Sequence, residues 1–466
     1  MDYPLEGLRG AEYNPRKISN EQLQKLWESI RRFGVVKPII CKTDGLIVAG
    51  HQRTKALRAN GVNTAPVYVL PGDTTQADEI KFNQLHNGTD VDHPDANAWI
   101  REPLKLGWQH VTKMDANWTC GMQVIRTNIA ALILKFGPWG ACVATLDGEV
   151  IHCTQYAMAC IQLNQPLLVY GVPTERKAEY KEFLGDQYGR FSYDNLERKT
   201  YIQTLAQLNR IRDVPGTLPR ESGLYRDAVE PWLKENPKAR GFDFGSGKGD
   251  YAGKLRREGY NMMDLELFRR VQGQNAIDTV WVNRAINQLC MALKKMGRFD
   301  FVVCDSVFNS VDCPEAEFAV ATMLGALCKV GGRIFYSGRT LKSVHAALKS
   351  GNYKTKNGSA QQLYFLDEEG YSGIFRNGEW FYQKFHTQEQ CEHLGTYMGI
   401  EAPEAKMGSG TWRCTGIKTH DVPFEDIERA IRYEFELDWP EGKKINRSED
   451  VLAAFRPFFA EAAAGT

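Results

Sequence analysis

Apolar residues near the start of the chain change between helical and extended spacing. Leu23, Leu26 and Ile30 recur at the spacing of one helix face, and the polar residues just before them predict a helix start. Two short apolar runs, 36–41 and 46–49, follow and are separated by a glycine turn. A second helix and a further strand complete the pattern. The spacing predicts a compact α/β module of short strands and helices.

The same landmarks recur 103 residues later. The helix end at Phe33-Gly34 recurs at Phe136-Gly137, and the turn at Asp44-Gly45 recurs at Asp147-Gly148. The polar loop is not kept, because Gly50, His51 and Arg53 correspond to Cys153, Thr154 and Tyr156. A degenerate second copy with added helices, which has lost its anion site, explains this recurrence, and chance similarity is the alternative.

The stretch 213–219, with two prolines and a glycine, is the best linker in the chain. After it, short apolar strands alternate with helices as in a doubly wound parallel sheet. We therefore divide the chain into an N-terminal domain (1–95), a middle domain (96–215), a doubly wound domain (216–420) and an acidic helical extension (421–466) in which we find no chemistry.

Charge is balanced overall but concentrated locally. The chain has 58 Lys and Arg against 57 Asp and Glu, which excludes a generally basic nucleic-acid coat. Residues 15–58, which include Arg16, carry ten basic against three acidic residues. This excess indicates either solvated helix faces or a face for phosphates.

Cysteine usage and hydropathy place limits on the class of protein. The eleven cysteines form no Cys-x-x-Cys pair and have no histidine at zinc-ligand spacing. We expect reduced thiols and no metal. No apolar run approaches the ~18 residues of a membrane span, so we expect a soluble cytoplasmic protein without a membrane partner.

The strongest motif lies at the start of the doubly wound domain. Asp243 ends an apolar strand, and Gly245, Gly247 and Gly249 follow at alternate positions before a helix. Glycines at such a turn let the backbone pass close to a ligand. The spacing differs from that of the phosphate loop and from that of the dinucleotide fingerprint.

This turn resembles the first motif of class I S-adenosylmethionine-dependent methyltransferases, in which an acid precedes Gly-x-Gly-x-Gly. The resemblance implies that Asp243, the three glycines and an acid after the next strand hold S-adenosylmethionine. That acid is Glu266 or Asp264, and counting from Gly259 favours Glu266. Residues 299–311 and 327–336 read as the fourth and fifth strands with their adjoining segments, so the resemblance covers about 224–420.

The exit loop of the fourth strand departs from the amino-methyltransferase pattern. Such enzymes carry Asp/Asn-Pro-Pro-Tyr/Phe there, whereas this chain has Asp305-Ser306-Val307-Phe308-Asn309. It also lacks a Pro-Cys nucleophile, because Cys313-Pro314 is in the reverse order. The loop is similar to that of methyltransferases associated with DNA phosphorothioation loci and phages. We expect Asp305, Asn309 and Phe308 to be catalytic, with Asn309 holding the acceptor or capping the loop.

A second resemblance covers residues 10–90. The run Val48 to Leu57, with Gly50, His51, Gln52 and Arg53, resembles the ParB/sulfiredoxin superfamily. It implies an anion site made by a helix N-terminus and the arginine fork, with Arg16 nearby, for phosphate, CTP or ATP. Sulfiredoxin activity is doubtful because His51 stands where the cysteine is expected. His51 is a proton carrier or only a hydrogen-bonding residue.

Together these features predict an α/β chain with a ParB-like α+β domain, a degenerate second copy and a Rossmann-like class I methyltransferase domain. The function expected first is methylation of a flipped base in duplex DNA, and the expected partners include DNA with modified bases and a second copy of the chain in a homodimer. Phe308, Trp380, Phe381 and Tyr382 are available to stack on the base. The alternatives are a nucleotide-gated DNA clamp and a ParB-like nuclease or kinase.

Overall fold

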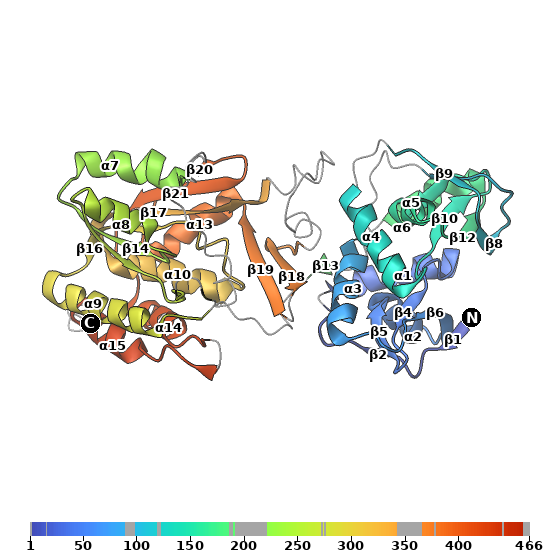
Figure 1. The fold of residues 1–466 in the computed structure, drawn as a ribbon, viewed down its shortest axis with the longest axis horizontal. Helices are drawn as coiled ribbons and strands as arrows, with labels where there is room; N and C mark the ends of the chain where they lie inside the picture. The colour runs from blue at the N-terminus through green and yellow to red at the C-terminus, as the bar shows by residue number, and fades with distance from the viewer. Residues whose placement is uncertain are drawn as a thin grey trace. The chain divides into compact units, whose positions relative to one another are not determined.

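The structure is a computed structural model of the 466-residue chain. It describes residues 2–14, 16–88, 98–118, 123–185, 190–191, 221–271, 274, 276–342, 366–376, 379–439 and 442–459. The chain divides into two compact units (Figure 1): unit 1 comprises residues 1–197 and 345–381, and unit 2 comprises residues 198–344 and 382–466. Each unit is described by itself below. The predicted linker 213–219 lies outside the described residues.

The first module of unit 1 is a small mixed sheet with helices. Its five strands run in the order β1 (Asp2–Pro4), β6 (Thr64–Val69), β4 (Ile39–Cys41), β5 (Leu46–Ala49) and β2 (Arg9–Gly10). Its helices are α1 (Asn20–Phe33), α2 (His51–Ala59) and α3 (Gln76–Gly88). Helix α1 begins with a full capping box, in which Ser19 and Gln22 satisfy each other's backbone N–H groups.

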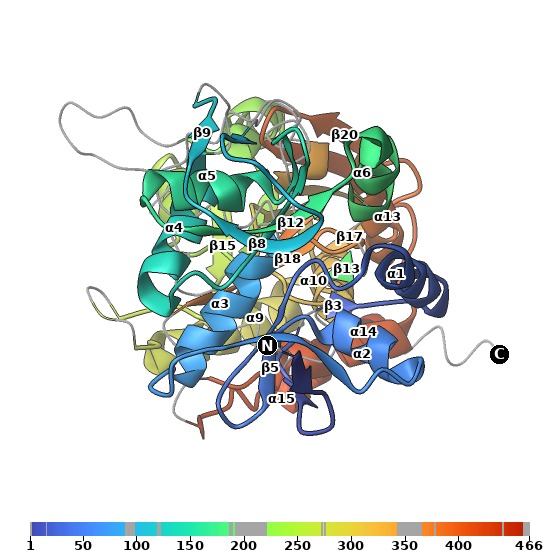
Figure 2. The same ribbon diagram turned by 90° about the vertical axis from the view of Figure 1, so that its right-hand side faces the viewer.

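The second module of unit 1 has a four-stranded sheet. The strand order is β11 (Val150–His152), β10 (Cys142–Thr145), β12 (Leu167–Val172) and β8 (Gly107–Val111). Figure 2 shows β8 beside β12, and the two strands pair antiparallel. The helices of the module are α4 (Gln123–Phe136), α5 (Thr154–Gln162), η1 (Thr174–Arg176) and α6 (Lys177–Gly185). Two strand pairs complete unit 1: β7 (Ala98–Ile100) with β9 (Met114–Ala116), and β3 (Arg16–Lys17) with β13 (Arg190–Phe191).

The two modules repeat the same elements at an offset of 103 residues. Helices α1 and α4 both have 14 residues, α2 and α5 both have 9, and β6 and β12 both have 6. The antiparallel register is also repeated, because Ile40 pairs with Ala49 and Val143 pairs with His152. The parallel register differs by one residue, since Val67 pairs with Ile39 but Tyr170 pairs with Val143. The recurrence is therefore a feature of the backbone, whereas its origin in duplication stays a prediction.

Unit 2 is built on a mostly parallel sheet. Its strands run in the order β15 (Asn261–Leu265), β14 (Arg240–Phe244), β16 (Phe299–Cys304) and β17 (Cys328–Thr340). At its end, β17 also pairs parallel with β19 (Glu379–His386), and along its length it pairs antiparallel with β21 (Thr411–Ile417), next to β20 (Glu404–Met407). β18 (Tyr371–Arg376) precedes β19 in the chain. The Rossmann-like α/β fold expected from the sequence is confirmed.

The helices of unit 2 follow the strands as in a doubly wound fold. They are the π-helical turn η3 (Tyr225–Val229), α7 (Glu230–Glu235), α8 (Asp250–Arg257), α9 (Thr279–Met296), α10 (Pro314–Leu327), α13 (Gln388–Met398), α14 (Phe424–Phe435), α15 (Ser448–Phe455) and η5 (Arg456–Phe458). Among the described residues, no helix has the length and apolar character needed to span a bilayer.

The C-terminal extension packs on the methyltransferase-like part of unit 2. Helix α14 packs on α10, and α15 packs on α9 (Figure 1). The indole nitrogen of Trp439 donates to the Leu267 carbonyl at 3.0 Å, next to the end of β15. The extension is therefore part of the core of unit 2.

Candidate functional site

The glycine turn after β14 adopts the conformation that its residues predict. Gly245, Gly247 and Gly249 all have positive φ angles, of 75°, 59° and 70°. A Cβ at Gly245 would lie 2.4 Å from Val307 Cγ2, and one at Gly249 would lie 3.0 Å from Asp264 Oδ2. A Cβ at Gly247 would meet no atom within 4 Å. Two of the glycines therefore allow close packing, and the third faces open space where a ligand can approach the backbone.

The two acids at the end of β15 have different partners. Glu266 accepts the Gly247 N–H at 2.8 Å and the Phe268 N–H at 3.0 Å. Asp264 instead forms an ion pair with Arg256 at 2.6 Å and accepts from the Ser246 hydroxyl at 3.1 Å. Burial raises the pKa of Glu266, and its two backbone donors oppose that rise. Glu266 is thus tied to the open part of the turn, which favours it over Asp264 as a ribose ligand.

Asp243 lies at the buried end of this group of acids. Its side chain is 4% exposed, and its Oδ2 accepts from the Tyr225 hydroxyl at 2.7 Å. Burial raises its pKa well above the ordinary value, and the neighbouring carboxylates add to the rise. The sequence did not indicate this contact, because no motif spacing relates Tyr225 to Asp243.

Asp305 follows β16 at the same edge of the sheet. Its Oδ1 accepts from the Ser337 hydroxyl at 2.7 Å and from the Ser306 hydroxyl at 3.2 Å. Ser306 has a φ of 64°, which is unusual for a residue with a side chain, and its N–H donates to Ser337 Oγ at 2.8 Å. The loop is held in a strained conformation, as is common at functional sites. Asp305, Asp243 and Glu266 therefore meet at one edge of the sheet.

The other two predicted catalytic residues have structural contacts. Phe308 is fully buried, with its ring near those of Tyr336 and Trp412. The structure thus gives Phe308 a core position in place of the predicted one against a base, because its ring is enclosed by other aromatic side chains. Asn309 accepts the Lys384 N–H at its carbonyl, and its side chain donates to Ser310 Oγ at 3.2 Å. That contact is a loop cap, one of the two roles expected for Asn309.

The other aromatic residues offered for stacking do not strengthen that prediction. Tyr382 is 1% exposed and therefore also buried. The side chains of Trp380 and Phe381 lie outside the described part of the chain. A cluster that the sequence did not indicate lies behind the loop: Glu317 contacts His386 Nε2 at 2.7 Å and Lys384 Nζ at 3.4 Å. This buried cluster fastens β19 to the start of α10.

In unit 1, the residues predicted to hold an anion lie at the N-terminus of α2. Gly50 is the N-cap with a φ of 96°, and Arg53 Nη2 donates to the Pro38 carbonyl at 3.0 Å. His51 Nε2 accepts the Ala11 N–H at 3.1 Å. Burial and the nearby Arg53 lower the pKa of His51 to about 4. The contact with Ala11 gives His51 a hydrogen-bonding role, one of the two roles expected for it, and the role of proton carrier stays a prediction.

The remaining predicted phosphate ligands are only partly placed. Gln52 is half-buried in the first turn of α2. Arg16 lies in β3, and its side chain is outside the described residues. The basic excess of residues 15–58 is reduced by internal contacts, since Arg32 pairs with Glu28 and Lys42 pairs with Glu79. Basic residues that remain at the surface include Arg31 and Lys55.

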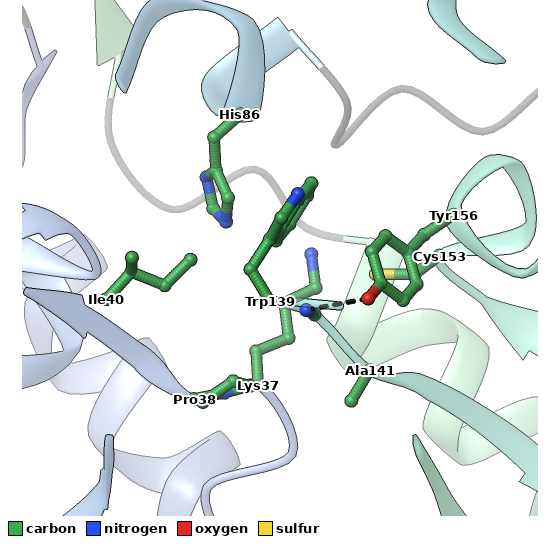
Figure 3. Close-up of a pocket in the computed structure, with 9 residues that line it drawn as sticks. Lys37, Pro38, Ile40, His86, Trp139, Ala141, Cys153 and Tyr156 are labelled. Carbon is green, nitrogen blue, oxygen red and sulfur yellow. Dashed lines mark hydrogen bonds between the residues drawn. The ribbon is translucent and has the colours of Figure 1, made fainter. Parts of the chain in front are cut away.

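In the second module the corresponding position is closed by a side chain. The Tyr156 hydroxyl accepts the Gly140 N–H at 2.9 Å, and Tyr156 is 4% exposed. Beside it is a cavity of about 20 Å³, room for roughly one water. Figure 3 shows Trp139 and Tyr156 facing residues of the first module across this cavity. Its lining comprises Lys37, Pro38, Ile40, His86, Trp139, Gly140, Ala141, Cys153 and Tyr156.

Comparison with known proteins identifies both parts of the chain. Residues 2–84 match the family model of the ParB N-terminal domain, and residues 219–386 match that of a methyltransferase domain. The chain belongs to the ParB N-terminal domain family and carries, in unit 2, a class I methyltransferase domain. The ParB-like and the class I methyltransferase resemblances are thereby confirmed, whereas the DNA-modification type of the methyltransferase stays a prediction.

Two curated proteins resemble the first part of the chain. The ParB-like nuclease domain-containing protein YnaK of Escherichia coli is 38% identical over 73 residues, which are 16% of this chain and 84% of that protein. The chromosome-partitioning protein ParB of Myxococcus xanthus is 33% identical over 84 residues, 17% of this chain and 28% of that protein. The chain thus covers under a third of the partition protein, whose activity as a whole does not transfer.

Solved structures resemble unit 2 more distantly. The PH0226 protein of Pyrococcus horikoshii is 15% identical, with a TM-score of 0.28, and the alignment covers 45% of this chain and 97% of that one. A Burkholderia thailandensis 1,6-didemethyltoxoflavin-N1-methyltransferase with bound S-adenosylhomocysteine is also 15% identical, with a TM-score of 0.27, covering 42% and 79%. TM-scores this low support no conclusion about the substrate. The assignment of unit 2 to the methyltransferases rests on its strand order and on the family match.

Proposed function

We propose that the protein transfers a methyl group from S-adenosylmethionine to a base of DNA. The observation that carries the proposal is the turn from Gly245 to Gly249, which faces open space at Gly247 and is flanked by Asp243 and Glu266. The open space at Gly247 supports the proposal because it leaves room for the adenosyl group to approach the bare backbone. In this proposal Glu266 binds the ribose hydroxyls.

For the methyl-transfer step, the protein mainly has to position the donor and the acceptor. When bound, the cofactor supplies a methyl group on a cationic sulfur, which leaves as a neutral thioether. The acceptor nitrogen or oxygen must therefore lie in line with that methyl group, and orientation supplies most of the acceleration. In this proposal Asp305, next to the strained Ser306, holds or deprotonates the acceptor.

DNA is proposed as the acceptor because of the first module. The N-terminus of α2 and Arg53 offer donors for a phosphate oxygen, and Lys55 and Arg31 add surface charge nearby in the chain. Such contacts position a duplex without reading its sequence, and their affinity falls with salt. Reaction at a base of the duplex would then need base flipping.

The first experiment tests the donor and the acceptor together. Isothermal titration with S-adenosylmethionine should show binding that is lost in Asp243→Ala, while Glu258→Gln at the far end of α8 binds normally. Mass spectrometry of nucleosides from DNA of expressing cells should show a methylated base absent from the Asp243→Ala control. Binding without any methylated nucleoside would place the acceptor outside DNA.

The second experiment tests the role of Arg53. The Arg53→Ala variant should weaken binding to all duplex sequences and should lower the slope of log K against log salt by about one. The Lys234→Ala variant on α7 is the control for a lost exposed charge. An unchanged salt slope in Arg53→Ala would remove this residue from the phosphate-binding face.

A nucleotide-gated clamp is the second candidate function. It is favoured by the glycine N-cap of α2, which supplies no side chain to cap the first-turn N–H groups. In that case CTP or ATP should bind in an Arg53-dependent manner, without binding of S-adenosylmethionine. Metal-dependent nicking or nucleotide turnover that is lost in Arg53→Ala would instead support the nuclease or kinase alternative.

A further inference from the structure

A buried tyrosine outside the glycine turn contacts the carboxylate before that turn. Tyr225 Oη donates to Asp243 Oδ2 at 2.7 Å, and the two residues are 1% and 4% exposed. A buried carboxylate without such a donor would be costly to keep ionised. This hydrogen bond therefore does more than fill the core, because it affects the charge of a carboxyl predicted to hold the cofactor.

The position of Tyr225 is fixed by the segment before β14. Its ring stacks on Tyr251 of α8, with centroids 4.0 Å apart and planes 7° from parallel. The Tyr251 hydroxyl accepts the Ser222 N–H at 2.6 Å, and Ser222 Oγ accepts the Leu224 N–H at 3.2 Å. Tyr225 also begins the π-helical turn η3, and such turns are frequent at functional sites. Several independent contacts thus hold one hydroxyl at Asp243.

Asp243 depends on this donor more than the neighbouring acids depend on any single partner. Asp264 has Arg256, Glu266 has two backbone N–H groups, and Asp305 has two serine hydroxyls. The titratable and charged groups around Asp243 and Tyr225 are Tyr251, Arg256, Asp264, Glu266, Arg269, Cys304 and Asp305. The three other carboxylates all disfavour the charge on Asp243. The hydrogen bond from the Tyr225 hydroxyl favours this charge.

We propose that Tyr225 is a positioning residue for cofactor binding, whose hydroxyl orients the Asp243 carboxyl and favours its charged form when the cationic S-adenosylmethionine binds. The inference rests on the proposed function. S-adenosylmethionine carries a sulfonium, whereas S-adenosylhomocysteine carries a neutral sulfur. Loss of the Tyr225 hydroxyl should therefore weaken binding of the first ligand more than binding of the second.

The test is isothermal titration of the full chain with both ligands from about pH 6 to about pH 9. In Tyr225→Phe we expect S-adenosylmethionine to bind about tenfold more weakly, with a smaller loss for S-adenosylhomocysteine. The Asp243 carboxyl loses the donor that lowers its pKa. As the pH is lowered, binding in the variant should therefore begin to weaken at a higher pH than binding in the wild type. Tyr260→Phe removes the hydroxyl of another tyrosine that packs on the same hydrophobic cluster, and it is the matched control, which should retain wild-type binding and pH dependence.

A double-mutant cycle separates positioning from a general effect on folding. Asp243→Asn keeps an acceptor for Tyr225 but removes the charge, so it should lose the preference for S-adenosylmethionine, and Tyr225→Phe should add little in that background. Equal losses from Tyr225→Phe in both backgrounds, or wild-type affinity and pH profile in Tyr225→Phe alone, would overturn the inference. Failure of the wild type to bind S-adenosylmethionine would overturn the proposed function first.

Discussion

The two modules of unit 1 share a backbone but differ at the start of their second helix. In the first module α2 begins after Gly50, and its first turn carries His51 and Arg53. In the second module α5 begins after Cys153, and the positions of His51 and Arg53 are taken by Thr154 and Tyr156. Both N-caps adopt the left-handed conformation, with φ angles of 96° and 60°.

The difference is clearest at the position of Arg53, which a core side chain occupies in the second module. Arg53 is half-buried and places its guanidinium beside a backbone carbonyl, so charge stays near the surface. Tyr156 is almost fully buried, and its ring packs on Trp139 with centroids 4.8 Å apart. In the second module the same backbone position thus contributes to the core shared by the two modules. Substitutions at matched positions should therefore affect stability in one module and binding in the other.

The largest effect expected is the loss of stability in Tyr156→Ala. Removing a buried aromatic side chain leaves a cavity and should cost about 3–5 kcal/mol. The matched Arg53→Ala removes one hydrogen bond of a half-buried side chain and should cost about 1–2 kcal/mol. Denaturant unfolding of the full chain, followed by a probe of unit 1, measures both changes. Equal costs at the two positions would show that Arg53 is also a core residue.

Tyr156→Phe divides the cost at this position into two parts. The variant keeps the ring contacts with Trp139 but leaves the Gly140 N–H without its acceptor. We expect a loss of about 1–3 kcal/mol from that unsatisfied donor alone. A loss of stability as large as that of Tyr156→Ala would mean that the hydrogen bond, and not the filled volume, accounts for the contribution of Tyr156.

The next effect in size is a pH dependence in the first module alone. Burial lowers the pKa of folded His51 to about 4, against 6.5 for the exposed group. The unfolded chain then binds the extra proton, so the contribution of His51 to stability is fully present above about pH 6.5 and is lost as the pH falls toward 4. The upper limit of that loss is about 3 kcal/mol.

The measurement compares the wild type with His51→Gln across this pH range. Glutamine can still accept the Ala11 N–H but does not titrate, so the difference between the two unfolding free energies isolates the histidine. Carboxylates also titrate near pH 4, but they contribute to both proteins and cancel. A difference that stays constant with pH would show that folded His51 takes up its proton as easily as the unfolded one.

Much of this comparison was visible in the sequence. The offset of 103 residues, the glycine turns and the lost polar loop all follow from residue types with strong local preferences, such as Gly34 and Gly137 at helix ends. The glycine turn of unit 2 was predictable for the same reason. Local backbone rules act over a few residues and can be read directly from the chain.

The contacts that sequence reasoning missed join residues far apart in the chain. Nothing near Phe308 indicates that Tyr336 and Trp412 enclose its ring, and nothing near Asp243 indicates the hydroxyl of Tyr225. The extension after residue 421 showed no motif, although Trp439 reaches the end of β15. Packing between distant segments decides such roles, and local periodicity does not contain that information.

The smallest effect expected is a change of stability when the N-cap residue of α2 or of α5 is substituted. Gly50→Ala places a Cβ about 3.1–3.3 Å from Arg53 Nη2 and from Ile39, in a left-handed conformation that itself disfavours side chains. We expect a loss of about 1–2 kcal/mol. Cys153→Gly at the matched position relieves the left-handed strain but adds backbone entropy to the unfolded chain and removes a buried thiol. We expect the free energy of unfolding to change by less than about 1 kcal/mol. Denaturant unfolding of both variants tests whether the two N-cap positions differ in this way.

A large loss of stability in Cys153→Gly would mean that packing of the thiol outweighs the left-handed strain. A loss confined to Gly50→Ala would show that the first module depends on a bare backbone at its N-cap, which a bound anion would also require.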